Sequence, residues 1–130
     1  MVETHQMAFM LHTLVEVVAA TKFMFFPSKQ LGKYTPEAHP IIRQYALLLL
    51  SSAATSSIFA RQPLSSLSKH VAAALALYHL GPMLRSIARL TRRSRQARAV
   101  LASEAMLFLL VHLCCLLSLL AVCRQIVSPA

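Results

Sequence analysis

The sequence has no tryptophan, aspartate or asparagine, and only four acidic side chains among its 130 residues. Only 13% of the residues are charged and 57% are hydrophobic, whereas soluble domains are about a quarter charged. Neither a nucleotide-binding glycine motif nor a G-x-S-x-G or H-E-x-x-H pattern occurs. Because no polar segment is long enough to hold a soluble active site, the composition predicts one compact membrane protein covering residues 1–130.

Cysteine is scarce as well. The three cysteines, Cys114, Cys115 and Cys123, all lie in the last apolar run. An odd number without C-x-x-C spacing excludes a disulfide framework and a zinc knuckle. We therefore predict reduced, unligated cysteines, no metal site and no bound cofactor.

What the chain does have is long apolar runs, of which the last, Ala105–Cys123, is the clearest. His112 is its only strongly polar side chain. A helix of that length rises about 28 Å, close to the hydrocarbon thickness of a bilayer. A helix that is apolar all round is unusual in a small soluble domain. This run is therefore predicted to be a transmembrane helix.

Three further runs resemble it, so the predicted fold is all-α, a four-helix transmembrane bundle with short loops. The spans cover about 7–26, 41–60, 66–88 and 101–123. The third has the shortest uncharged core, Val71–Leu84, which reaches full length only if Leu64–Ser68 joins it and Lys69 extends to the interface. Gly81 and Pro82 are expected to kink its far end.

Basic side chains give the protein a net charge of +9 and predict its orientation. They occupy the short connections between apolar runs, which points to anionic lipid headgroups as partners and not to nucleic acid. Four spans place ten bases on one side and Arg61, Lys69 and Arg124 on the other, so both termini should face away from the basic, cytosolic or matrix side. Six of the ten form the predicted headgroup-binding and topology segment: Arg85, Arg89, Arg92, Arg93, Arg95 and Arg98.

A few polar side chains interrupt the spans. Glu16 lies near mid-membrane, where a charge costs about 2.5–3.5 kcal/mol, and His12 is one helical turn away on the same face. Counting residues from the basic side puts His79 roughly 8 Å deep, His112 roughly 10 Å, Glu16 roughly 15 Å and His12 roughly 20 Å. We expect one polar interior, with Glu16 hydrogen-bonded to His12 or within reach of other polar groups: Ser52, Thr55 or His112.

The segment FPSKQLGKYTPEAHPIIRQYALLLL resembles the first connection of small four-helix integral membrane proteins from fungi. In that family an F-P pair ends the first helix and an R-Q-Y triplet precedes the second. The matching residues are Phe26, Pro27, Arg43, Gln44 and Tyr45. The resemblance covers about a fifth of the chain; it implies four helices and carries no activity with it.

Three function classes follow. The first is a non-catalytic membrane protein, either a packing partner for another membrane protein or an assembly factor. The second is an intramembrane enzyme or binder of an isoprenoid- or sterol-like lipophile, with Glu16, His12 and His112 as candidate acid–base residues. The sequence lacks the several acids, tryptophans and asparagines expected in such a pocket. The third is a haem-binding or proton-relay bundle, in which His79 and His112, on different helices, are the candidate ligands.

Overall fold

The computed structural model describes residues 3–31, 34–93 and 104–125, and within them the chain forms four long helices and no strand. The helices are α1 (Thr4–Phe25), α2 (His39–Phe59), α3 (Ser66–Arg93) and α4 (Glu104–Arg124). Two short 3-10 turns, η1 (Pro27–Gln30) and η2 (Pro36–Ala38), lie between α1 and α2. The predicted all-helical, four-helix fold is confirmed.

Three of these helices are long and apolar enough to cross a membrane: α1, Ser66–Thr91 of α3, and α4. The second helix has 21 residues, but its last third is the polar stretch SSAATSS, which lowers its hydropathy. These three helices are consistent with an integral membrane protein, and a fourth span through α2 stays a prediction.

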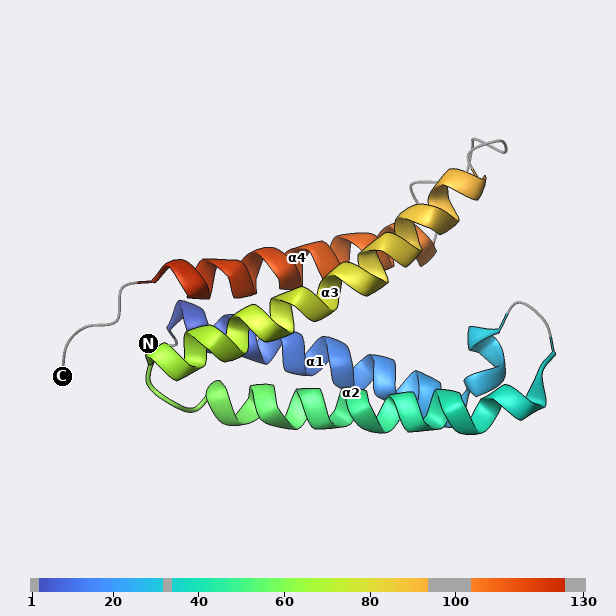
Figure 1. Cartoon of the computed structure of the whole chain (residues 1–130), viewed down its shortest axis with the longest axis horizontal. Helices are drawn as coiled ribbons and strands as arrows, with labels where there is room; N and C mark the ends of the chain where they lie inside the picture. The colour runs from blue at the N-terminus through green and yellow to red at the C-terminus, as the bar shows by residue number, and fades with distance from the viewer. Residues whose placement is uncertain (1–2, 32–33, 94–103, 126–130) are drawn as a thin grey trace.

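The helices form two antiparallel hairpins, α1 with α2 and α3 with α4, which pack against each other mainly through α1 and α4 (Figure 1). The start of α1 and the end of α4 lie at one end of the bundle, together with the connection from α2 to α3 (Figure 1). The 3-10 turns, the end of α3 and the start of α4 lie at the opposite end (Figure 1). The short loops between consecutive helices produce this up-and-down order.

Small side chains make the interior, because alanine lets helix backbones approach closely. The terminal apolar cluster, at the end that carries the termini, draws on all four helices: Ala8, Phe9, Ala60, Ala72, Ala76, Leu119 and Val122. The α1–α2 apolar cluster, further along α1, consists of Ala20, Ala46 and Leu49. Between these clusters along α1 lie two fully buried polar residues, His12 and Glu16.

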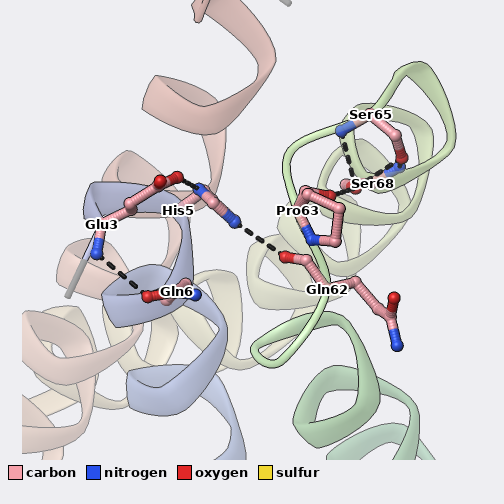
Figure 2. Close-up of polar contacts among 7 residues, drawn as sticks. All are labelled: Glu3, His5, Gln6, Gln62, Pro63, Ser65 and Ser68. Carbon is pink, nitrogen blue, oxygen red and sulfur yellow. Dashed lines mark hydrogen bonds and ion pairs between the residues drawn. The ribbon is translucent and has the colours of Figure 1, made fainter. Parts of the chain in front are cut away.

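The third helix starts where the predicted span of 66–88 starts and ends beyond it. It begins at Ser66, so Leu64 precedes it, and it continues through Pro82 to Arg93. A reciprocal set of hydrogen bonds between Ser65 and Ser68 caps its first turn, including Ser65 Oγ accepting from the Ser68 backbone amide at 3.1 Å. These bonds hold the start of α3 at the turn after α2 (Figure 2).

A buried histidine joins that turn to the start of α1. The Nδ1 atom of His5 lies 3.1 Å from a carboxylate oxygen of Glu3, and its Nε2 atom lies 3.0 Å from the backbone oxygen of Gln62 (Figure 2). Both partners accept hydrogen bonds, so both contacts form together only when both ring nitrogens carry protons. His5 therefore connects the two hairpins at their terminal end.

Candidate functional site

The centre of the bundle holds a row of hydrogen-bonded side chains that takes one residue from each helix. We call Ser52, His12, His79 and His112, in that spatial order, the histidine row. His12 Nε2 lies 2.9 Å from Ser52 Oγ, and His12 Nδ1 lies 2.9 Å from His79 Nε2. The remaining nitrogen of His79, Nδ1, lies 2.9 Å from His112 Nδ1. All three imidazoles are at least 95% buried.

Three neutral imidazoles can satisfy this row in two opposite senses, since each has one N–H and one lone pair. In the forward sense Ser52 donates to His12, His12 to His79, and His79 to His112. In the reverse sense His112 donates to His79, His79 to His12, and His12 to the Ser52 oxygen. The same heavy-atom positions serve both senses, so protons can move along the row without a change in packing.

A second polar string lies beside the row, with Glu16 within 4.8 Å of His12 and His79. The Oη atom of Tyr78 donates to Glu16 Oε2 at 3.2 Å and lies 3.1 Å from the Oη atom of Tyr45, an exposed side chain. We call these three residues the tyrosine branch. The other carboxylate oxygen of Glu16, Oε1, is buried and has no hydrogen-bond partner among the described residues. A buried polar atom without a partner is costly and calls for an explanation.

Aromatic rings enclose both strings. The Tyr78 ring stands nearly edge-on to His12 and His79, with ring centroids 6.3 and 5.3 Å away. On the far side, Phe108 stacks on His112 at 6.4 Å, and the ammonium of Lys22 lies 5.7 Å from the Phe108 ring centre. The described residues give Glu16 no basic partner within ion-pairing distance; the ion pairs found there are His5 with Glu3 and Arg89 with Glu104.

The structure brings together the four polar residues that the sequence singled out, but not in the pairs expected. Glu16 is fully buried in the interior, and its partner is Tyr78 and not Ser52, Thr55 or His112. The expected bond between His12 and Glu16 does not form, because both nitrogens of His12 are used by other side chains. Thr55 is exposed and donates to the Ser51 carbonyl of its own helix at 3.0 Å.

The predicted depths of the histidines were also wrong. Residue counting separated His12 and His79 by about 12 Å along the membrane normal, yet their rings are hydrogen-bonded. The count assumed that α3 leaves the membrane near Arg85, whereas the helix continues to Arg93. His79 thus lies 14 residues from the helix end, about 21 Å at the rise of an α-helix, and reaches the level of His12.

Tyr78 is the residue that sequence reasoning missed. A tyrosine inside an apolar run carries a hydroxyl that needs a partner when buried. Its position directly before His79 placed it beside the expected polar interior, and this was the available signal. Its hydroxyl also contacts that of Tyr45 on α2.

The predicted lipid-binding arginines are described only in part. Arg89 lies 4.0 Å from Glu104 in an exposed ion pair across the start of α4. Arg85, Arg92 and Arg93 belong to α3, while Arg95 and Arg98 lie outside the described residues.

The haem hypothesis required His79 and His112 to bind an iron between them. Their Nδ1 atoms are 2.9 Å apart, so a porphyrin between them would require the rings to separate.

Comparisons with known proteins add no family to this picture. The chain matches no family model, no curated protein and no solved structure. The function therefore has to be argued from the buried site itself.

Proposed function

We propose that this protein is an integral membrane proton relay, in which the histidine row accepts and passes protons inside the bilayer. The observation that carries the proposal is the uninterrupted row Ser52–His12–His79–His112, with each link at 2.9 Å. Ionisable residues within a membrane are expensive, and their use is normally functional. If close packing were the row's only use, serine and alanine would supply it at a lower cost of burial.

Proton transfer along the row balances without a charged product. A proton delivered to Ser52 lets its hydroxyl proton move to His12 Nε2, while the Nδ1 proton of His12 moves to His79 Nε2. The Nδ1 proton of His79 then moves to His112 Nδ1, and the Nε2 proton of His112 leaves. The row ends in the reverse sense, and one proton has crossed the bundle from α2 to α4.

The tyrosine branch, which is not hydrogen-bonded to the row, supports access to the neighbouring Glu16 carboxyl from one side of the membrane. It runs from Glu16 through Tyr78 to Tyr45, which lies in the half of α2 near the 3-10 turns. Towards the other end of the bundle, the terminal apolar cluster blocks a proton path, because none of its seven side chains can form a hydrogen bond. This arrangement suits a buried acid–base centre that receives protons from the end of the bundle with the 3-10 turns, and it does not form an open channel.

For the orientation, we propose four crossings with both termini on the side opposite the basic connections. The second helix is as long as α4 and packs along α1, so it crosses wherever α1 does. The cost of placing a serine hydroxyl in the membrane is reduced where the hydroxyl is hydrogen-bonded inside the bundle. Ser56, for example, is fully buried and donates to the Phe9 carbonyl at 2.8 Å. Anionic headgroups are the proposed partners of the arginines at the end of α3.

Nitrogen-15 NMR of histidine-labelled protein in lipid bilayers tests the relay. A relay predicts exchange-averaged ring-nitrogen signals for His12, His79 and His112, with exposed His70 as the internal control. In the His79→Gln variant the amide makes one bond as donor and one as acceptor but passes no proton, so His12 and His112 should each settle into one tautomer. Fixed single tautomers in the unmodified protein would contradict the relay and favour a packing or assembly role.

Glu16→Gln separates the same two roles through function. The amide keeps a hydrogen bond to Tyr78 but offers no exchangeable carboxyl proton. A relay that draws its protons from the Glu16 carboxyl beside the row predicts a folded protein without function, scored as complementation of a deletion strain of the source organism. Full complementation by Glu16→Gln, together with loss of folding in Glu16→Leu, would assign the site to packing.

A further inference from the structure

We infer that His12, His79 and Glu16 form a binding site for a divalent transition-metal ion, of which Zn²⁺ is the natural probe. One ligand atom from each residue, two imidazole nitrogens and a carboxylate oxygen, lies within 4.8 Å of the other two. All three side chains are fully buried. Such a pair of nitrogens with one carboxylate is a donor set that zinc and ferrous ions accept.

The distances fit an ion with little rearrangement. The two facing nitrogens, His12 Nδ1 and His79 Nε2, are 2.9 Å apart. Two nitrogens bound to one tetrahedral zinc ion are about 3.4 Å apart, because each Zn–N bond is about 2.0–2.1 Å. The rings therefore need to part by about half an ångström to admit the ion.

Each of the three ligands also has a hydrogen-bond partner on the side away from the proposed ion, as metal ligands usually do. His12 Nε2 faces the Ser52 hydroxyl, and His79 Nδ1 faces His112 Nδ1, so both outer nitrogens can donate while both inner nitrogens offer lone pairs. Tyr78 donates to one oxygen of the Glu16 carboxylate. An ion would therefore replace only the hydrogen bond between His12 Nδ1 and His79 Nε2, while the outer contacts of all three ligands stay in place.

The unpartnered oxygen of Glu16 is the second, independent observation. Glu16 Oε1 has no hydrogen-bond partner among the described residues, and no basic side chain there pairs with this carboxylate. A bound cation would supply the missing partner and the opposite charge at the depth where an uncompensated carboxylate is most costly. Three protein ligands leave a further coordination position open, as in zinc sites that bind water or a substrate.

The sequence hides this site because its ligands have no local spacing. His12 and Glu16 share one face of α1, but the third ligand is 63 residues further along the chain, on α3. The inference does not depend on the proton relay, although the two compete for the same atoms. An ion between His12 and His79 fixes the proton of His12 on Nε2 and that of His79 on Nδ1, which stops transfer along the row.

The test uses the full chain, purified in mild detergent with an affinity tag that lacks histidine, stripped with a chelator and titrated with Zn²⁺. We expect one zinc ion per chain after gel filtration, measured by elemental mass spectrometry. His12→Gln, His79→Gln and Glu16→Gln should each lose it. His112→Gln, which removes only the outer partner of His79, should weaken affinity about 10- to 100-fold. His70→Gln, at an exposed histidine of the same helix, is the matched control and should bind as the unmodified chain does.

Cobalt titration of the unmodified chain keeps the test decisive if a variant fails to fold. Co²⁺ should show the visible absorption of a low-coordinate nitrogen and oxygen site without thiolate charge-transfer bands, although buried Cys115 lies on the neighbouring helix. Thiolate bands, no bound metal in the folded chain, or unchanged binding in His79→Gln would each overturn the site. Failure of the relay shows instead as fixed tautomers in metal-free protein, so the two ideas fail separately.

Discussion

His79 occupies the middle of the histidine row, and its replacement by leucine of similar size should measure what the row contributes to stability. The change removes two hydrogen bonds, to His12 Nδ1 and to His112 Nδ1. Bonds between membrane helices average about 0.6 kcal/mol and reach about 1.7 kcal/mol. His79→Leu should therefore lower the free energy of unfolding by about 1–3 kcal/mol, while His112→Leu, which removes one bond, should cost about half as much.

Unfolding by a denaturing detergent in mixed micelles, followed by circular dichroism, gives these values. The matched control is His70→Leu, since His70 is exposed on the same helix and should change stability by no more than about 0.5 kcal/mol. A double-mutant cycle adds a sharper number. His79 and His112 should couple by about 0.6–1.7 kcal/mol, whereas Ser52 and His112, which share no bond, should be additive.

The reasoning is refuted if His79→Leu is no more destabilising than His70→Leu. It is also refuted if the Ser52 and His112 replacements couple as strongly as those of His79 and His112, because the row would then not consist of separate pairwise bonds.

Three further predictions concern other parts of the chain. Cysteines introduced at Lys29 and Gln62 in a cysteine-free background should react with a membrane-impermeant maleimide from opposite sides of the membrane, and same-side labelling would exclude the proposed orientation. The native cysteines, which are free in the structure, should stay reduced in cells, so a disulfide-linked dimer through Cys123 on a non-reducing gel would contradict this expectation. His5→Phe should lower the free energy of unfolding by about 1–3 kcal/mol, because the Glu3 carboxylate and the Gln62 backbone oxygen each lose their contact with the ring. No measurable change in detergent-induced unfolding would show that His5 contributes packing alone.

The fold was predictable because its signals are local. Apolar runs of bilayer length and proline-marked connections are read directly from the chain, and they predicted four helices close to those observed. Helical periodicity puts Ala72, Ala76 and His79 on one face, and all three are buried. The helical spacing of Arg85, Arg89, Arg92 and Arg93 indicates that the third helix continues past its apolar segment, and α3 does reach Arg93.

The site was predictable as a set of residues and not as a network. Periodicity placed His12, Glu16, His79 and His112 on interior faces, but pairing depends on how the helices shift along one another. A shift of one turn is about 5.4 Å, which is more than the length of a hydrogen bond. For this reason the partner of Glu16 was assigned to His12 on α1 or to residues of α2 and α4, when it is Tyr78 on α3.

The division of the row between two hairpins has a consequence for how the protein is made. The bond between Ser52 and His12 closes within the first hairpin, and that between His79 and His112 closes within the second. Glu16, in contrast, finds its partner only across the hairpin interface. A chain whose synthesis has stopped after α2 therefore holds an unsatisfied carboxyl in the lipid, a chemical mark that distinguishes it from a finished protein. Degradation of orphaned first hairpins should depend on the two groups whose partners lie on α3, the Glu16 carboxyl and His12 Nδ1.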